Sequence, residues 1–401
     1  MTTVDIYTPD LYVEAPPHEV FERLRREQPV YRQEMPDGTW YWAVLRHADV
    51  VRVSRQPVLY SASAGGVVLE DLDPDSLAMM RNMLLAMDPP RHIEHRRNIS
   101  PSFRARVIAG LEPRIRAICT DIMDAVEPGA EIDFVHDVAS KLPAQIIGEL
   151  MGLPRDDWPA LHRMAERNSG SQDPDINPDA GDDERGNASV EMAMYAIEHA
   201  QRRRQEPPRE DLTTLLLDAE IEGRHMTDIE FGSFFVQLVT AANDTTRTML
   251  SSGLLALIEH PEQLAAVRAD LDLLPGAIEE VLRWANPLHY FRRTATEDAT
   301  LGGVAIGAGD KLAMVYTSAN RDDEVFVDPH RFDITRDPNP HLSFGVAEHF
   351  CLGAHLARLE GRVFFEELLG RFGTIELVGP PARQRSNLNN ALKSLPVTLT
   401  P

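Results

Sequence analysis

The chain of 401 residues is poor in cysteine and in basic side chains. Cys119 and Cys351 are its only cysteines, which excludes a disulfide framework and favours a reducing compartment. Its 40 Lys and Arg residues face 63 Asp and Glu residues, a formal net charge of −23. A charge of this sign disfavours binding to nucleic acid and to anionic membranes.

Long hydrophobic runs are also missing. No window approaches the ~18 consecutive apolar residues that a transmembrane helix needs. The first residues, MTTVDIYTPDLYVEAPPHEV, show no basic stretch followed by an apolar one, which a signal peptide would have. We therefore expect a soluble, cytoplasmic protein without a membrane anchor, acting as a monomer.

The composition otherwise predicts a large folded core, with 43% hydrophobic and 26% charged residues. Alternation around Tyr31 and Trp40 to Val44, with Pro36-Asp37-Gly38 between, predicts a hairpin. Helical periodicity dominates the middle of the chain, and short strands return after it. The predicted helices cover residues 107–126, 142–151, 189–204, 212–219 and 229–258, and the later strands cover 299–306, 311–317, 374–377 and 396–400.

This order of elements predicts a mainly α (α+β) fold. We expect one helix-rich domain over residues 1–401, with small sheets near both ends. Residues 61–87 and 169–187 have little periodicity, and the second stretch is acidic. They are interpreted as surface loops or, alternatively, as lids over a pocket.

The segment FGVAEHFCLGAHLAR, residues 344–358, carries the strongest chemical signal. Cys351 follows a glycine-bearing irregular stretch and precedes a helix-forming run, and a thiolate is stabilised at such a helix N-terminus. A lone cysteine is more often an inert buried residue. Zinc fits poorly, because no second Cys/His pair has ligand spacing.

The same segment resembles the haem-binding loop of the cytochromes P450. The resemblance implies that Cys351 is the axial ligand of the iron in haem b, and that Phe344, His349 and Gly353 contact the cofactor. Ala347 stands where the family usually has glycine, so we expect it to keep a negative φ. Further motifs follow the family's order, so the resemblance covers nearly the whole chain.

A charged motif precedes this loop. Glu280 and Arg283 are three residues apart and share one helix face, and alone they predict no more than a surface ion pair. Together with Arg331 they resemble the buried Glu-Arg-Arg network of the family. The resemblance implies that the three residues form a structural lock before the cysteine loop.

The longest predicted helix begins at a capping box, Thr227 to Glu230. Its middle holds Asn243-Asp244-Thr245-Thr246, four weak helix formers, which is unusual in an apolar helix and typical of functional sites. The alternative is a polar face with hydroxyls bonded to the preceding turn.

This stretch resembles the family's oxygen-activating segment. The resemblance implies that Asp244 and Thr245 deliver protons to dioxygen and that Ala241 contacts the haem. Ala242 stands at a usual glycine position.

The haem carboxylates need anchors. His92 and Arg96 are four residues apart on one predicted helix face, and Arg293 and His349 match the family's other contacts to these groups. Each of these residues alone is more often a surface residue, but four such groups from distant segments suit a dianion.

The resemblance further implies a lipophilic pocket and a terpenoid, steroid, branched lipid or natural-product intermediate as substrate. Met-bearing, apolar linings suit such molecules. The residues expected to line the pocket are Val68, Leu84, Gln237, Thr240, Leu288, His289 and Phe291.

Electrons must come from other chains, because no flavin- or nicotinamide-binding segment is present. A ferredoxin and its reductase are the expected partners, docking by charge complementarity on a basic cluster; the alternative is a solvated helix face. The cluster consists of Arg91, His95, Arg96, Arg97, Arg104 and Arg106 around Pro101, and of Arg358 and Arg362 after Cys351. The alternatives are a haem-thiolate binding or sensing protein without turnover and, within the enzyme class, peroxide-driven oxidation. The Asp244-Thr245 pair favours the dioxygen-dependent monooxygenase.

Overall fold

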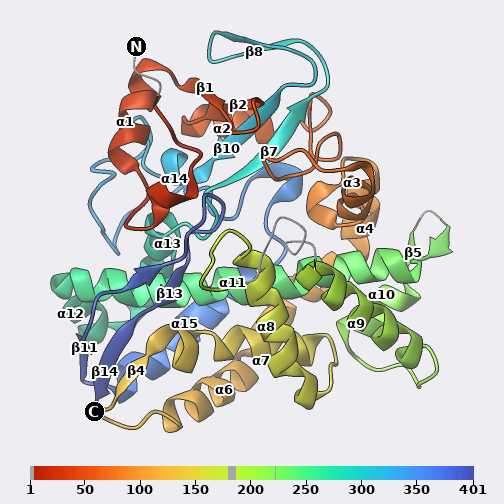
Figure 1. Cartoon of the computed structure of the whole chain (residues 1–401). Helices are drawn as coiled ribbons and strands as arrows, with labels where there is room; N and C mark the ends of the chain where they lie inside the picture. The colour runs from red at the N-terminus through yellow and green to blue at the C-terminus, as the bar shows by residue number, and fades with distance from the viewer. Residues whose placement is uncertain (1–3, 179–186, 222) are drawn as a thin grey trace.

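One long helix, α11 (Asp228–Glu259), crosses the middle of the molecule (Figure 1). The structure is a computed structural model that describes residues 4–178, 187–221 and 223–401. The Thr227 hydroxyl accepts from the Glu230 backbone N–H at 3.2 Å, and the Glu230 carboxylate accepts from the Thr227 N–H at 2.9 Å. The predicted capping box is therefore present and fixes the start of the helix.

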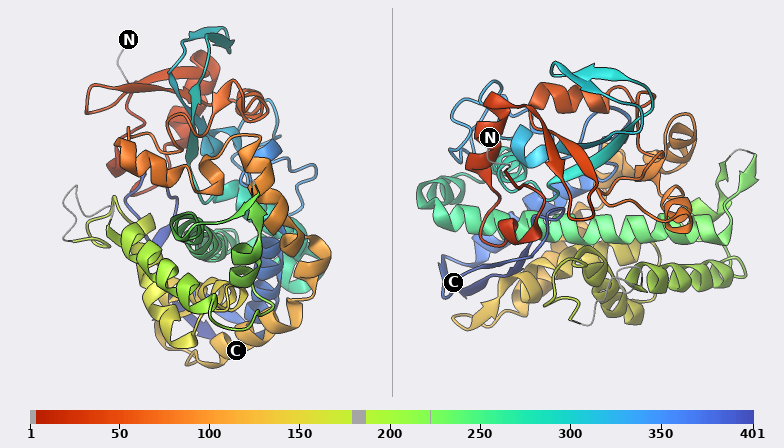
Figure 2. Two further views of the ribbon diagram at one scale, coloured as in Figure 1. Left: turned by 90° about the vertical axis from the view of Figure 1, so that its right-hand side faces the viewer. Right: turned by 45° about the horizontal axis from the view of Figure 1, so that its top comes forward.

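Helices α7, α8, α9, α13 and α15 make the largest helix contacts with α11. The left view of Figure 2 shows α11 nearly end-on with other helices around it. Most side chains of α11 are therefore buried. The helices other than α11 are α1 (His18–Glu27), α2 (His47–Ser54), α3 (Pro74–Met80), α4 (Arg91–Ile99), α5 (Ala105–Ala109), α6 (Glu112–Asp124), α7 (Lys141–Leu150), α8 (Trp158–Ser169), α9 (Asn187–Arg203), α10 (Leu212–Asp218), α12 (Pro261–Ala269), α13 (Leu274–Trp284), α14 (Tyr316–Ala319) and α15 (Ala354–Arg371).

The largest sheet has five strands in the order β1-β2-β10-β7-β3, with β2 and β10 parallel and the other pairs antiparallel. A three-stranded sheet, β11-β14-β4, lies near the C-terminus (Figure 1). The strands are β1 (Val30–Glu34), β2 (Trp40–Val44), β3 (Tyr60–Ser61), β4 (Glu131–Asp133), β5 (Glu220–Ile221), β6 (Arg224–His225), β7 (Tyr290–Ala295), β8 (Ala299–Leu301), β9 (Val304–Ile306), β10 (Lys311–Val315), β11 (Thr374–Leu377), β12 (Ala382–Arg383), β13 (Leu392–Ser394) and β14 (Pro396–Thr400).

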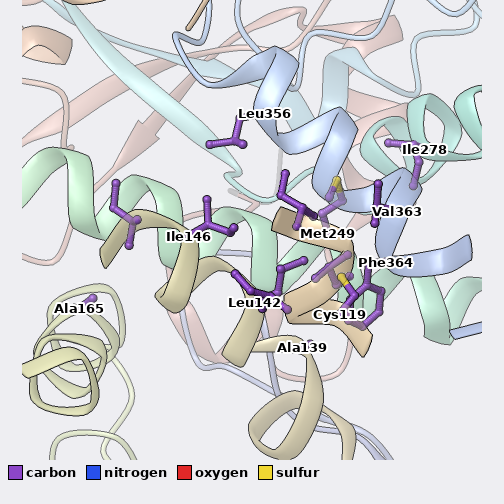
Figure 3. Packing of buried hydrophobic residues seen from close by; sticks show 14 of the residues in the cluster. Cys119, Ala139, Leu142, Ile146, Ala165, Met249, Ile278, Leu356, Val363 and Phe364 are labelled. Atoms are coloured by element: carbon purple, nitrogen blue, oxygen red, sulfur yellow. The ribbon is translucent and has the colours of Figure 1, made fainter. Parts of the chain in front are cut away.

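The main hydrophobic core lies where α6, α7, α11 and α15 meet. Figure 3 shows Leu142 of α7, Met249 of α11 and Phe364 of α15 converging there, and all three are almost fully buried. Cys119 of α6 lies in the same cluster with no exposure. Burial raises the pKa of its thiol to about 12, so Cys119 is the inert cysteine of the pair.

The predicted mainly α fold with small sheets is confirmed, and the hairpin forms as β1 and β2. Residues 61–87 are not a plain loop: they contain the short helix α3, which Asp73 caps by accepting from the backbone of Asp75 and Ser76. In the stretch 169–187, residues 179–186 lie outside the described residues, and the preceding turn buries Asp173. Among the described helices, none is long and apolar enough to cross a membrane.

Candidate active site

The Cys351 loop folds back on itself before α15. The Cys351 N–H donates to the Phe344 carbonyl at 2.7 Å, and Gly345 has a φ of +67°, which suits glycine. Cys351 lies three residues before α15, as the sequence predicts. A Cβ placed on Gly353 would meet no atom within 4 Å, so the chain leaves open space directly beside the sulfur.

Ala347 does not keep a negative φ, and this expectation is wrong. It has a φ of +62° at the start of a short 3-10 helix, Ala347–His349. The loop therefore needs the left-handed backbone that glycine adopts easily, and alanine adopts it at a cost of about 1–2 kcal/mol. The loop keeps its shape and stores some strain at Ala347.

The surroundings of the Cys351 sulfur suit the binding of a metal cation. Burial raises the pKa of the thiol, whereas the Gly353 backbone N–H and the charges of Arg96 and Arg358 lower it in part. Cys351 is half-buried, and a thiol with a raised pKa loses its proton when a metal ion binds, because the cation replaces the proton.

Four cationic or hydrogen-bonding side chains lie close together beside the Cys351 loop: His92, Arg96, Arg293 and His349. The rings of His92 and His349 are 4.4 Å apart, and both nitrogens of His92 and Nε2 of His349 are buried without a hydrogen-bond partner among the described residues. Arg293 is 4% exposed. Arg96 donates to the carbonyls of Glu348 and Phe350 at 3.0 and 2.6 Å, and so also holds the Cys351 loop.

The electrostatic environment of these four side chains is positive. Burial, then Arg96 and Arg293, lower the pKa of His92 to about 4, and burial, then Arg293, lower that of His349 to about 2. Buried polar groups are normally satisfied, so the orphaned imidazole nitrogens beside two guanidinium groups indicate an anion-binding site. Two carboxylates would satisfy them.

The middle of α11 leaves one face uncovered. Ala241 is exposed, and Gln237 and Thr245, one turn away on either side, are half-buried, although the rest of the helix is largely buried. The three residues repeat every four positions and therefore share one face. The Thr245 hydroxyl donates to the Ala241 carbonyl at 2.7 Å, as in the alternative of a hydroxyl bonded to the preceding turn, and its oxygen can still accept.

Asp244 lies beside Thr245 but points into a charged environment. Its side chain is 9% exposed, and Oδ1 lies 3.2 Å from Nη2 of Arg247. Burial raises the pKa of Asp244, and Arg247, Ser169 and His162 offset part of this effect. A buried carboxyl with a raised pKa can hold a proton and release it.

The charged lock forms with a different arginine. Arg283 donates to both oxygens of Glu280 at 2.7 Å, and both side chains are fully buried. The side chain of Arg331 is exposed, and this residue contributes its carbonyl, which accepts from Arg283 at 3.1 Å. The guanidinium of Arg336 is the third charged group of this network, and its Nε lies 3.2 Å from Oε2 of Glu280. The prediction for Arg331 is therefore wrong.

The predicted pocket residues divide into two groups. His289 belongs to the core: its Nδ1 lies 2.8 Å from the Thr317 hydroxyl and its ring packs on Tyr12, so its place in the pocket is corrected. Val68, Gln237, Thr240, Leu288 and Phe291 are half-buried, and Leu84 is buried. Phe291 contacts the 61–87 segment through Ala62, Val67 and Ala86.

Sequence reasoning missed three polar residues of the site. Arg336 and Arg247 form buried ion pairs, and Asn168 donates to the Thr240 hydroxyl at 3.1 Å. Arg247 lies one turn after Asp244, and this i, i+3 spacing is a signal that could have found it. Arg336 and Asn168 carry no local signal, because their partners are distant in sequence.

These residues fit haem b. The open space at Gly353, the sulfur prepared for a cation, the orphaned histidines and the uncovered face at Ala241 match an iron porphyrin with two carboxylates. Cys351 would bind the iron, and His92, Arg293 and His349 would hold the carboxylates.

Comparison with known proteins agrees. A family model described as Cytochrome P450 matches residues 186–400. Linalool 8-monooxygenase of Pseudomonas putida is 36% identical over 408 residues, covering 100% of both chains. The methyl-branched lipid omega-hydroxylase of Mycobacterium tuberculosis is 39% identical over 389 residues, covering 94% of this chain and 90% of that one.

A solved structure supports the same assignment. Mycobacterium marinum cytochrome P450 CYP268A2 in complex with pseudoionone has a TM-score of 0.91 and 36% identity, covering 99% of this chain and 98% of that one. The chain therefore belongs to the cytochrome P450 family and is a monooxygenase that uses haem b and dioxygen.

Proposed function

We propose that the chain hydroxylates a terpenoid, steroid, branched lipid or related natural-product intermediate, with electrons from a separate ferredoxin and ferredoxin reductase. Relatives of 36–39% identity carry the names linalool 8-monooxygenase, steroid C26-monooxygenase and methyl-branched lipid omega-hydroxylase. The observation that carries the proposal is the uncovered face of α11 at Ala241, between the Asp244-Thr245 pair and the half-buried apolar residues of the 61–87 segment and β7.

Each residue has a defined task in this proposal. Haem, when bound, would supply the activation of dioxygen, and the Cys351 thiolate would hold the iron and donate electron density to it. Thr245, on the uncovered face, orients a proton toward the reacting oxygen, and Asp244 resupplies that proton. Val68, Leu288 and Phe291 exclude water from the substrate.

The pocket offers a small polar subsite. Gln237 accepts weakly from the Leu85 N–H at 3.4 Å, and the Thr240 hydroxyl accepts from Asn168. Both residues precede Ala241 on α11, so a single hydroxyl or carbonyl of a lipophilic substrate can bond there while its hydrocarbon part contacts Phe291. A mostly apolar molecule with one polar group fits best.

The electron-donor surface is proposed around α4 and α5. Arg97, Arg104 and Arg106 are exposed there, next to exposed apolar side chains of Ile93, Val107 and Phe350. An apolar centre with charged surroundings is typical of a docking surface. Phe350 directly precedes Cys351, so a carrier bound here lies close to the iron ligand.

We also propose that the protein is a monomer, that it forms a single domain and that it is located in the cytoplasm. The exposed large apolar residues are spread over many elements, which favours a monomer. Cys351 must stay reduced to bind iron, which favours the cytoplasm.

The experiment separates an enzyme from a haem-thiolate binding protein. Substrates are first found by the spin-state shift of the Soret band, and product is then compared with NADH consumed in the presence of a surrogate ferredoxin and reductase. Thr245→Ala is expected to keep substrate binding and to lower product formed per NADH. Thr246→Ala is the matched control, because its hydroxyl faces Glu360 instead, at 3.2 Å.

Two outcomes would contradict the proposal. Substrate-induced spectral shifts without any product would favour the binding protein. Equal coupling in the wild type and Thr245→Ala would remove the proton-delivery role of Thr245.

A further inference from the structure

Arg247 is shared between two carboxylates. Its Nη1 lies 2.7 Å from Oε1 of Glu166 on α8, and its Nη2 lies 3.2 Å from Oδ1 of Asp244 on its own helix. The Arg247 side chain is 3% exposed, that of Asp244 9% and that of Glu166 21%. The closer of the two contacts therefore belongs to the carboxylate that reaches solvent.

The charges around Asp244 do not balance. The groups that face it are Arg247 from α11, and His162, Glu166 and Ser169 from α8. Burial lowers the pKa of His162, so this ring supplies less positive charge than an exposed histidine would. One guanidinium therefore lies between two carboxylates, and the negative charge of Glu166 raises the pKa of Asp244, which opposes the effect of Arg247.

A small cavity lies beside Asp244 and Thr245. Its volume is about 10 Å³, and it is lined by Ser169, Asp244, Thr245, Thr248, Pro287, Gln384, Asn389 and Ala391. Gln384 and Asn389 both donate to the Ser169 carbonyl, at 2.9 and 2.7 Å, which fixes the far wall.

We propose that Glu166 is a positioning residue that competes with Asp244 for Arg247 and thereby sets the pH range in which Asp244 resupplies protons. The inference rests on the proton-delivery role proposed above. Glu166 touches neither substrate nor cofactor in this proposal. It acts through Arg247, and it makes the proton supply depend on how α8 lies against α11.

Two substitutions shift Asp244 in opposite directions. In Glu166→Gln, Arg247 pairs with Asp244 alone, the pKa of Asp244 falls, and proton delivery is lost at a lower pH than in the wild type. In Arg247→Met, Asp244 loses its counter-charge, its pKa rises, and delivery extends to higher pH. A general loss of packing would not move the two profiles apart.

The measurement uses the haem-loaded protein with ¹³C-labelled aspartate. Infrared difference spectra are recorded through a pH titration, and the Asp244 carboxyl band is identified by its loss in Asp244→Asn. Product formed per NADH is measured over the same pH range. The midpoints of both curves are expected to move to lower pH in Glu166→Gln and to higher pH in Arg247→Met.

Glu191→Gln is the matched control. It removes the same charge from the neighbouring α9, where Glu191 pairs with Arg167 of α8 at 3.2 Å, and it should leave both midpoints unchanged. Since Arg247→Met removes a buried charge and can impair folding, Glu166→Asp is the second variant. It keeps the charge but shortens the reach to Arg247, and a smaller shift in the direction of Glu166→Gln is expected.

The failures of the two proposals are distinguishable. If Asp244→Asn uncouples turnover but the midpoints of Glu166→Gln equal those of the wild type, the inference about Glu166 is overturned and the proton-delivery role stands. If Asp244→Asn remains fully coupled, the delivery role itself is wrong, and the inference falls with it.

Discussion

At the scale of single residues, the site combines groups that are individually unfavourable. Buried nitrogens of His92 and His349 lack hydrogen-bond partners among the described residues, Cys351 is a half-buried thiol, and Ala347 has a left-handed backbone. Each costs free energy. Bound haem would relieve three of these costs, because its carboxylates would satisfy the imidazole nitrogens and its iron would satisfy the sulfur. The strain at Ala347 is not relieved.

Ala347→Gly is therefore expected to stabilise the protein. Glycine adopts a φ of +62° without a Cβ clash, and after its greater unfolded-state entropy is subtracted, a gain of roughly 0.5–1 kcal/mol remains. The matched change is Gly345→Ala, where the φ of +67° would strain an added Cβ that lies 3.4 Å from the His349 carbonyl. Chemical denaturation of the haem-loaded proteins should show midpoints moving in opposite directions. A lower midpoint for Ala347→Gly would show that the loop requires alanine.

At the scale of elements, the charged lock joins α13 to the long segment between α14 and the Cys351 loop. Arg283 donates to the carbonyls of Asn320 and Pro329 as well as to Glu280, and Arg336 donates to those of Val327 and Arg331 at 2.6 and 2.9 Å. Guanidinium groups with several donors suit this task. The network therefore fixes a segment that has little regular structure.

Arg336→Met and Arg331→Met separate the two candidate arginines. Arg336 is 9% exposed beside a fully buried Glu280, so its loss leaves a less compensated buried charge and should cost about 3–5 kcal/mol. Arg331 is exposed, and its substitution should stay within about 0.5 kcal/mol. Free energies of unfolding from urea titrations decide between them. Equal losses in both variants would restore Arg331 to the network.

Local signals predicted more of this fold than non-local ones did. The capping box fixes the start of α11, and alternation gives β1 and β2. In contrast, β4 is not predicted from the sequence, because it has only three residues and its partner β14 lies far along the chain. The same division applies to the site: Cys351 and Asp244 stand in local motifs, whereas Arg336 is defined by contacts that only the folded chain creates.

At the scale of the whole molecule, the charge is unevenly distributed. The net charge is −23, yet Arg97, Arg104 and Arg106 are exposed together around α4 and α5. Other basic residues of the expected cluster are engaged: Arg358 pairs with Glu279 at 2.6 Å and Arg362 with Glu112 at 2.6 Å. The proposed docking surface is thus smaller than the sequence predicts.

Electron transfer from an acidic ferredoxin should therefore depend on these exposed arginines and on salt. The double variant Arg104→Gln/Arg106→Gln is expected to lower the second-order rate of reduction at low ionic strength, because these charges steer the encounter. At about 0.15 M salt the screening length is about 8 Å, so the difference from the wild type should shrink as salt rises and vanish near ~1 M, where that length is about 3 Å.

Arg163→Gln/Arg202→Gln, a pair of exposed changes on α8 and α9 that removes the same number of charges, is the control for net charge and should leave the rate unchanged. Stopped-flow reduction of the haem, measured with substrate bound, gives both rates directly. Equal slowing by Arg163→Gln/Arg202→Gln would mean that overall charge drives the encounter, because a long-range field does not distinguish one face from another. If only Arg104→Gln/Arg106→Gln slows reduction, and the difference disappears at high salt, the ferredoxin must contact the face next to Cys351.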